Sequence, residues 1–323
     1  MSGAAREQRG FTPAWWLPGP HLQTIWPVLF RPRPRLATRL ERLELEDGDF
    51  IDIAWLNETA PGPTVLLLHG LEGSIDSHYA SGLMKSLGDA GFRVVFMHFR
   101  GCSGTPNRLP RGYHSGETGD LSRVVAHVEQ ASGNPVSAIV GFSLGGNVLL
   151  KWLGERREPA GLRRAIAVSV PYRLDQCAAR LERGLSRIYR DYLLRKLRAS
   201  YRRKFRQIES PLRVDPAGLK SFHAFDDRIT GPLHGFRGAD HYYAESSSRQ
   251  YLHRIRVETL LLHARDDPFM LAETVPTHAE LAPSVRLELS DHGGHVGFVA
   301  GGAPWRARYW LDERIVRELS QLR

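Results

Sequence analysis

Residues 136–155 read VSAIVGFSLGGNVLLKWLGE and carry the most informative pattern of the chain. The first part is an apolar run typical of a strand buried on both faces, and the last part has the character of a helix. Between them, Gly141, Ser143 and Gly145 match the G-x-S-x-G pattern, which places a serine on a sharp strand-to-helix turn. Glycines let such a turn close without Cβ clashes. The context favours a nucleophilic Ser143 over a serine that merely caps a helix.

The segments on either side of this turn alternate between strand-like and helix-like patterns. Such alternation predicts an α/β protein with a mostly parallel, eight-stranded sheet flanked by helices and joined by right-handed crossovers. The expected strands are residues 43–46, 50–55, 64–69, 93–99, 136–142, 165–170, 258–264 and 285–290, and the expected helices are 79–90, 117–130, 144–154, 272–281 and 305–322.

Two segments interrupt this alternation. Residues 172–252 contain no strand of the expected sheet, and apolar residues from Leu181 to Tyr192 recur at the spacing of a helix. An insertion of this length in an open α/β sheet is usually a cap over the active site. The first forty residues, rich in tryptophan and proline, are expected to form an irregular arm packed on the core. The predicted organisation is an arm (1–40), a core (41–171 and 253–323) and a cap (172–252).

A nucleophilic serine needs a histidine base and an acid that orients the base. In folds built around this turn, the chain order is serine, acid, histidine. Asp266 and Asp267 follow the expected strand at 258–264, and both are candidates for the acid. Counting from Ala264, the small residue that ends the strand, favours Asp267, whereas Asp266 would support the loop.

The base is expected after the last strand, where His292 and His295 both occur. The pair Gly293-Gly294 allows a loop that brings His295 back over the edge of the sheet, so His295 is favoured. We interpret His292 as structural.

The oxyanion hole of such a site is formed by backbone N–H groups, which leave no side-chain signature. By position, the donors are Leu144, directly after the nucleophile, and Leu71, in the loop after the third strand. Two roles are open for His114: contact with the substrate, or support of the loop that leads into the next helix. The second is favoured, because polar residues near helix starts usually cap them. The same applies to Asp120.

The net charge of +9 is concentrated in one stretch of the predicted cap. Residues 180–207 carry 11 arginines and lysines against Glu182 and Asp191, and the rest of the chain is balanced. Three interpretations are open: a solvated helix face, attraction to an anionic membrane surface, or nucleic-acid binding. No helix-turn-helix, RNP or zinc signature accompanies the stretch, so we expect no nucleic-acid partner.

Composition excludes several other classes of protein. Hydrophobic residues make up 42% of the chain, and glycine and proline are not concentrated in one tract, which excludes a disordered or collagen-like chain. No apolar run is long enough for a transmembrane helix, and no signal peptide is recognisable. Two cysteines make no disulfide framework, so a reducing cytoplasm is expected. No metal-ligand spacing occurs, and no cofactor is expected.

Several blocks in order along the chain resemble the YheT-like esterases of bacteria. These belong to the alpha/beta hydrolase group, which includes the mammalian abhydrolase-domain lipases. The resemblance implies the alpha/beta-hydrolase fold, with Ser143, Asp267 and His295 as charge-relay residues. Gly119 departs from the family, which more often has an acidic residue there. The blocks are residues 15–30, 66–74, 98–121, 140–155, 225–248, 263–270 and 292–298.

These features together predict a serine carboxylesterase that acts on short- to medium-chain esters through an acyl-enzyme. The alternatives are an acyltransferase or thioesterase using the same residues, a lipase acting at anionic membranes, and an inactive binding protein. Retention of all three relay residues argues against the last. The oligomeric state is left open.

Overall fold

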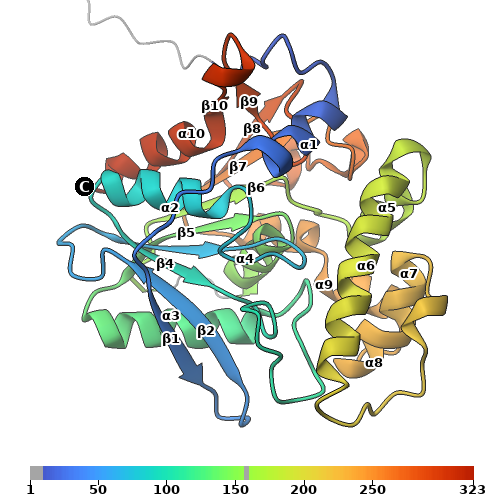
Figure 1. Cartoon of the computed structure of the whole chain (residues 1–323). Coiled ribbons are helices and arrows are strands. Elements are labelled where there is room, and N and C mark those ends of the chain that lie inside the picture. The colour runs from blue at the N-terminus through green and yellow to red at the C-terminus, as the bar shows by residue number, and fades with distance from the viewer. Residues whose placement is uncertain (1–9, 156–159) are drawn as a thin grey trace, which may run out of the picture.

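The computed structural model describes residues 10–155 and 160–323, so the first nine residues of the predicted arm lie outside it. An eight-stranded sheet forms its centre (Figure 1) in the order β1-β2-β4-β3-β5-β6-β7-β8. Only β2 runs antiparallel to its neighbours, which confirms the mostly parallel sheet. The strands are β1 (Arg39–Glu44), β2 (Phe50–Leu56), β3 (Thr64–Leu68), β4 (Arg93–Met97), β5 (Val136–Phe142), β6 (Arg164–Val168), β7 (Thr259–Ala264) and β8 (Val285–Ser290).

Four long helices cover the two faces of the sheet. Side chains alternate across β5, so Ile139 joins the apolar core on one face while Ala138 and Val140 join the core on the other. Helices α3 and α4 pack on the first face, and α2 and α10 pack on the second. Their bounds are α2 (Ala80–Asp89), α3 (Thr118–Ser132), α4 (Leu144–Glu155) and α10 (Trp310–Leu319).

Three expected elements differ from the structure. The first strand starts at Arg39 rather than residue 43, because this exposed edge strand extends along β2 without an apolar pattern. The helix expected at 272–281 is wrong: only short 3₁₀ turns form, at Ala272–Thr274 and His278–Glu280. Pro276 between them lacks an N–H and disfavours helical geometry at the preceding residue.

The last helix begins at Trp310, five residues later than expected, because the preceding residues pair in a short ribbon of β9 and β10. A 3₁₀ turn (Ser320–Leu322) follows the helix. The ribbon strands are β9 (Val299–Ala300) and β10 (Arg308–Tyr309).

The arm is also more regular than expected, because it contains the helix α1 (Pro20–Phe30). Proline at the first helical position suits a helix start, since its missing N–H would be unpaired there anyway. The Gln23 side chain fastens α1 to β9 by donating to the carbonyl of Val299 and accepting from its N–H.

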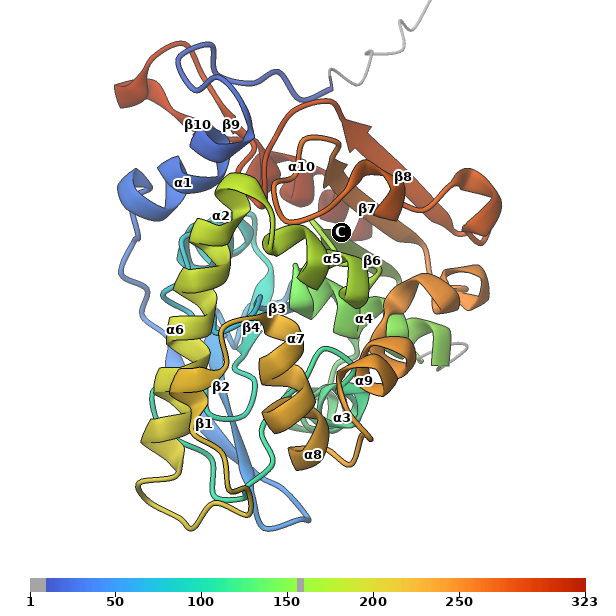
Figure 2. The ribbon, with the colours of Figure 1, turned by 90° about the vertical axis from the view of Figure 1, so that its right-hand side faces the viewer.

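Residues 172–252 contain no strand of the sheet and form a helical layer on one side of it (Figure 2). This inserted segment has its own apolar core, which includes Leu194, Phe225 and Tyr242. Its first half is helical as predicted, but Gly184 interrupts it with a positive φ. The helices are α5 (Leu174–Leu181), α6 (Arg187–Lys204), α7 (Phe222–Phe225), α8 (Gly231–Leu233) and α9 (Ala239–Ser246), with a π-helical turn at Asp226–Thr230 and 3₁₀ turns at Gly184–Ser186, Pro216–Gly218 and Ser248–Arg254.

Candidate active site

The turn between β5 and α4 holds Ser143 in a left-handed conformation, with φ of 51°. Such a backbone is rare for a residue with a side chain and marks a strained, tightly supported turn. The flanking glycines are required by space. A Cβ at Gly141 would lie 2.5 Å from the Gly145 carbonyl oxygen, and a Cβ at Gly145 would lie 2.5 Å from the His69 carbonyl oxygen. The turn therefore fits directly against the end of β3.

The side chains predicted to form a relay lie in one hydrogen-bonded chain. His295 Nε2 is 3.0 Å from Ser143 Oγ, and His295 Nδ1 is 2.8 Å from Asp267 Oδ2. The Asp267 carboxylate is buried, and its other oxygen accepts from the backbone N–H of Phe269 at 2.8 Å. The Phe269 ring stacks on the imidazole with centroids 3.9 Å apart. These contacts fix the direction of the imidazole and leave Nε2 facing the serine.

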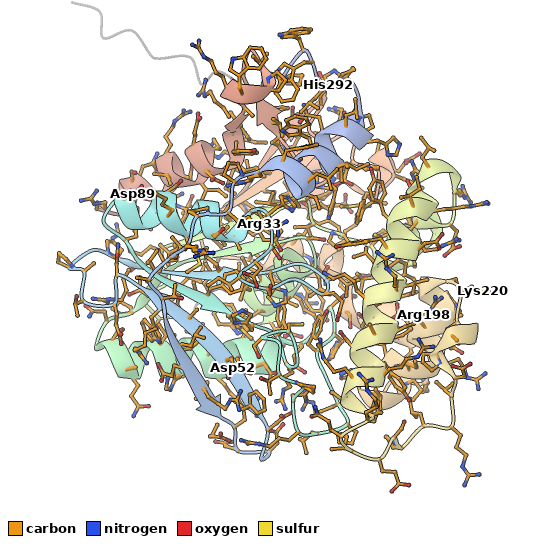
Figure 3. All side chains as sticks on the ribbon, viewed as in Figure 1. Arg33, Asp52, Asp89, Arg198, Lys220 and His292 are labelled. Atoms are coloured by element: carbon orange, nitrogen blue, oxygen red, sulfur yellow. The ribbon has the colours of Figure 1, made fainter. Side chains whose placement is uncertain are left out.

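The competing residues lie together at the edge of the same loops. Asp266 accepts from the backbone N–H of Gly294 at 2.9 Å and lies 3.3 Å from His292 Nδ1. The His292 side chain is exposed (Figure 3). Neither residue contacts Ser143 or His295 through a side chain.

The loop that carries His295 is strained and is held from both sides. Val296 and Phe298 both have positive φ, which is unusual for a β-branched and an aromatic residue. The N–H of Val296 donates to Ser169 Oγ at 3.1 Å, and the N–H of His295 donates to Thr24 Oγ1 at 2.9 Å. Thr24 belongs to α1, so the arm helps to position the histidine. Nothing in the sequence pattern predicted this contact.

The N–H groups of Leu71 and Leu144 find no hydrogen-bond acceptor in the part of the chain that the structure covers. Leu71 follows Gly70, and a Cβ at Gly70 would lie 3.3 Å from the Ser143 Cβ. Both N–H groups thus belong to segments that meet at the serine. The buried His69 ring fixes the end of β3 next to Leu71, because its Nε2 accepts from the N–H of Phe99. Burial lowers the pKa of His69 to about 3.

The residue after Leu71 is held by a cluster that the sequence pattern did not reveal. Glu72 has a positive φ of 51°. Its N–H donates to the Tyr113 hydroxyl at 2.8 Å, and that hydroxyl donates to the Glu72 carboxylate at 2.9 Å. From α6, Lys196 Nζ donates to the Glu72 carbonyl at 2.8 Å, and Ser200 Oγ donates to its carboxylate. The inserted segment therefore contacts the loop next to the serine directly.

A cavity of about 760 Å³ lies between the sheet and the inserted segment, with Ser143 and His295 in its lining. Its wall is mostly apolar, and α1, α5, α6 and α7 supply a large part of it. His114 also lines the cavity, next to His234, and burial holds its pKa well below the ordinary value. Its Nδ1 accepts from the N–H of Gly116, so the ring supports its loop while it faces the cavity.

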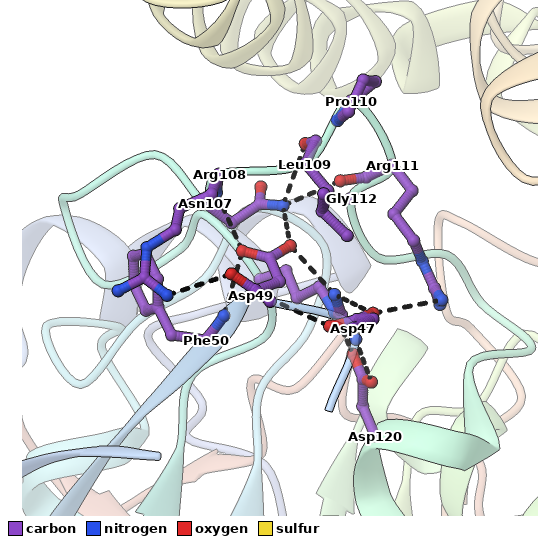
Figure 4. A network of polar contacts seen from close by, with 12 residues as sticks. Asp47, Asp49, Phe50, Asn107, Arg108, Leu109, Pro110, Arg111, Gly112 and Asp120 are labelled. Carbon is purple, nitrogen blue, oxygen red and sulfur yellow. Dashed lines mark hydrogen bonds and ion pairs between the residues drawn. The ribbon is translucent and has the colours of Figure 1, made fainter. Parts of the chain in front are cut away.

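An ion network beneath the cavity fixes the loop between β4 and α3 (Figure 4). The buried Arg100 guanidinium contacts Asp120 through two hydrogen bonds of 2.7 Å and Asp49 at 2.9 Å. Asn107 also donates to Asp49. Asp120 lies in the first turn of α3 and supports the loop, as predicted, and it does so through its buried carboxylate on Arg100. This network holds the segment that carries Tyr113 and His114.

Within residues 10–155 and 160–323, no group of three or more histidine, cysteine or acidic side chains is arranged to hold a metal ion. Over the same residues, no helix has the length and apolar character to cross a membrane.

The strand-turn-helix with its serine, the strand order and the late acid and histidine loops define a class of protein. The sequence model described as alpha/beta hydrolase fold matches residues 63–301. The chain belongs to the alpha/beta hydrolase family.

Particular relatives narrow the class. The Escherichia coli (strain K12) protein named "Putative esterase YheT" is 43% identical over 301 residues, which cover 91% of this chain and 88% of that protein. Human phospholipase ABHD3 is 28% identical over 310 residues, which cover 93% of this chain and 75% of that protein. Among solved structures, the Pyrococcus furiosus esterase Pf2001 matches with a TM-score of 0.57 and 20% identity, covering 88% and 91% of the two chains, and this supports the fold alone. These matches confirm the YheT-like resemblance and identify an esterase-type hydrolase.

Proposed function

We propose that the chain is a serine carboxylesterase in which Ser143 is the nucleophile, His295 the base and Asp267 the acid that orients it. The hydrogen-bonded chain of 3.0 and 2.8 Å through His295, at the wall of an apolar cavity, carries this proposal. In the first step, Ser143 Oγ attacks the ester carbonyl carbon while His295 Nε2 takes the hydroxyl proton. Buried, ionised Asp267 stabilises the imidazolium that results.

The tetrahedral intermediate carries a negative charge on the former carbonyl oxygen. We assign the unpaired N–H groups of Leu71 and Leu144 to this oxyanion, because both lie beside the serine and need an acceptor. Collapse of the intermediate breaks the bond to the alcohol oxygen, and His295 returns the proton to that oxygen. Water then attacks the acyl-enzyme by the same steps, which releases the acid and restores Ser143.

The cavity supports a substrate with an apolar acyl group. Its volume of about 760 Å³ is within the range of ligand pockets, roughly 300–1,000 Å³, and its apolar wall suits a short to medium alkyl chain. Because the inserted segment supplies much of that wall, we propose that residues 172–252 act as a cap that sets the chain-length preference.

The experiment is hydrolysis of p-nitrophenyl esters from acetyl to palmitoyl by wild type and Ser143→Ala. Wild type should turn over, with an optimum at short to medium chains, and Ser143→Ala should lose on the order of 10⁴-fold or more in kcat. Equal turnover by both proteins would refute the assignment of the nucleophile. A folded wild type with no activity on any chain length would refute the esterase proposal.

A second candidate is a lipase that acts at anionic membrane surfaces. The exposed apolar residues Leu29 and Ile188, which border the cavity beside a basic helix, favour it. Two groups of relatives carry the names phospholipase and monoacylglycerol lipase. The two functions share one chemistry and differ in how the ester arrives. Comparison of turnover on dispersed esters with turnover on esters in vesicles separates them.

A further inference from the structure

Two helices from distant parts of the chain border the cavity with exposed apolar side chains. Leu29 on α1 is 66% exposed and Ile188 on α6 is 60% exposed, yet both line the cavity. The helices adjoin, because His21 Nδ1 lies 2.9 Å from the Tyr189 hydroxyl, and Figure 2 shows them on the same side of the molecule. The apolar surface thus continues from the cavity to the outside.

The apolar residues at the start of α6 and in the 3₁₀ turn before it are spaced as on a buried helix face but are not buried. Leu185 is 62% exposed, Ile188 60% and Tyr192 44%, although they follow one another at intervals of three and four residues. An exposed apolar patch edged by polar residues usually marks an interaction site. We call this surface the docking face, and its residues are Leu22, Val28, Leu29, Phe30, Leu185, Ile188 and Tyr192.

Positive charge surrounds the docking face. Arg33, Arg183, Arg187 and Arg195 are exposed, and none of them forms an ion pair with a residue that the structure covers. The nearby acids Glu182 and Asp191 both form ion pairs with Arg190. These four guanidinium groups are therefore available to bind an anion outside the protein.

We propose that the docking face binds the surface of a bilayer that contains anionic phospholipid. Apolar side chains on adjoining helices enter the boundary between headgroups and acyl chains, while the arginines contact phosphate groups. A lipid surface is favoured over a protein partner because the face opens directly into the cavity, so an acyl chain can pass inward without crossing water. This proposal extends the proposed function by naming how a lipid ester reaches Ser143.

The test is sedimentation with vesicles of phosphatidylcholine alone or mixed with phosphatidylglycerol, in the Ser143→Ala background so that no lipid is consumed. Binding should be stronger on the anionic vesicles and should weaken as salt is added. Two double variants probe the face: Phe30→Asp with Leu185→Asp, and Arg183→Glu with Arg187→Glu. The arginine pair should weaken binding at least about tenfold, since each basic residue near an anionic surface is worth about 1 kcal/mol, or about fivefold. The apolar pair should also weaken binding, because two side chains that enter the headgroup boundary become charged.

Matched controls lie elsewhere on the molecule. Leu40 on β1 is 70% exposed, and Leu40→Asp should leave vesicle binding unchanged, as should Arg317→Glu on α10. Thermal unfolding midpoints check that each variant is folded. If the Phe30→Asp and Leu185→Asp double variant does not fold, Leu22→Asp takes its place. The proposal would be overturned if wild type did not bind vesicles, or if the control variants lost as much binding as the variants of the docking face.

If the chain self-associates and Leu185→Asp abolishes that association, the face belongs to a second copy of the chain instead. None of these outcomes depends on catalysis, so they are separable from failure of the esterase proposal.

A different set of contacts carries a second inference. Lys196 and Ser200 extend from α6 of the inserted segment to Glu72, the residue after Leu71. Lys196 Nζ donates to a backbone carbonyl of that loop, and Ser200 holds the carboxylate that Tyr113 also binds. A backbone with positive φ at Glu72 persists only when its surroundings fix it. We infer that Lys196 and Ser200 are positioning residues that direct the Leu71 N–H toward the oxyanion.

Kinetics with a transition-state probe tests this inference, which rests on the proposed function. Lys196→Met and Ser200→Ala should each lower kcat about tenfold with little change in KM, because the effect falls on the oxyanion and not on the bound substrate. An alkyl boronic acid, whose adduct with Ser143 is tetrahedral, should lose affinity by the same factor as kcat/KM. Ser200→Thr keeps the hydroxyl and should restore activity.

The matched control is Lys220→Met, on an exposed lysine of the inserted segment (Figure 3), which should behave as wild type. A fall in kcat without a parallel loss of boronic acid affinity would overturn the inference. Unchanged kcat in Lys196→Met and Ser200→Ala would do so as well. If wild type hydrolyses no ester, the esterase proposal fails, and the affinities of wild type and the variants for the boronic acid still test the inference.

Discussion

Replacement of Asp267 by asparagine tests the relay at its most specific point. The carboxylate has two partners that both require an acceptor: the Phe269 N–H at 2.8 Å and His295 Nδ1 at 2.8 Å. An asparagine offers one oxygen and one NH₂ group. If its oxygen stays on Phe269, the NH₂ faces Nδ1, which must then accept. The proton moves to Nε2, and the base can no longer take the serine proton.

If the amide flips, its oxygen faces Nδ1 and the histidine keeps the correct tautomer. Its NH₂ group then faces the Phe269 N–H, so two buried donors lie opposite each other without an acceptor. A buried donor left unpaired costs about 1–3 kcal/mol, which reduces the competent population by roughly 5- to 150-fold. Loss of the carboxylate charge also weakens stabilisation of the imidazolium, by roughly ten- to a hundredfold more. The two effects multiply, so kcat should fall about 10²- to 10⁴-fold.

The assay is single-substrate kinetics on the best p-nitrophenyl ester, with Asp266→Asn as the matched control. Asp266 contacts only His292 and the Gly294 N–H among the residues described, so its variant should lose no more than a few-fold. An Asp267→Asn enzyme within about tenfold of wild type would refute the reasoning. A larger loss in Asp266→Asn would move the acid to the neighbouring residue.

Other consequences can be measured on stability. Gly145→Ala should lower the unfolding midpoint strongly or prevent folding, because its Cβ would lie 2.5 Å from a backbone oxygen, whereas Gly218→Ala meets nothing within 4 Å and should change the midpoint little. Arg100→Leu should lower the free energy of unfolding by about 3–5 kcal/mol, measured by urea denaturation, because it leaves buried carboxylates unpaired. Replacement of the exposed Arg108 should cost under about 1 kcal/mol, and a comparable loss in both would contradict this argument. Burial raises the pKa of Asp226 from 3.8 to about 6, so the folded state binds a proton that the unfolded state has lost, and wild-type stability should fall as pH rises between these values. Asp226→Asn should remove about 3 kcal/mol of this dependence, and identical pH curves would disprove it.

The sheet and the serine turn could be predicted because their signals are local. Buried strands such as β5 and β7 are continuous apolar runs, and Gly141, Ser143 and Gly145 stand within five consecutive residues. The acid and the histidine follow from chain order once the serine is placed.

Features that depend on distant segments could not be predicted. The pairing of Asp120 with Arg100, and of Thr24 with the N–H of His295, joins residues far apart in sequence. The helical spacing from Leu185 to Tyr192 indicated a helix but not that its apolar side faces outward. Spacing reports periodicity, whereas burial is decided by what packs on the other side.

The two ends of the inserted segment are bound to each other. The N–H of Arg249 donates to the carbonyl of Tyr172 at 3.1 Å, and the N–H of Leu174 donates to Ser247 Oγ at 3.1 Å. Ser143, Asp267 and His295 all lie outside this closed loop. The segment therefore resembles an exchangeable part: a graft at its paired ends that kept Lys196 and Ser200 on Glu72 would replace much of the cavity wall and leave Ser143, Asp267 and His295 in place. In this architecture, exchange of one inserted segment can change the substrate preference while the serine, acid and histidine stay the same.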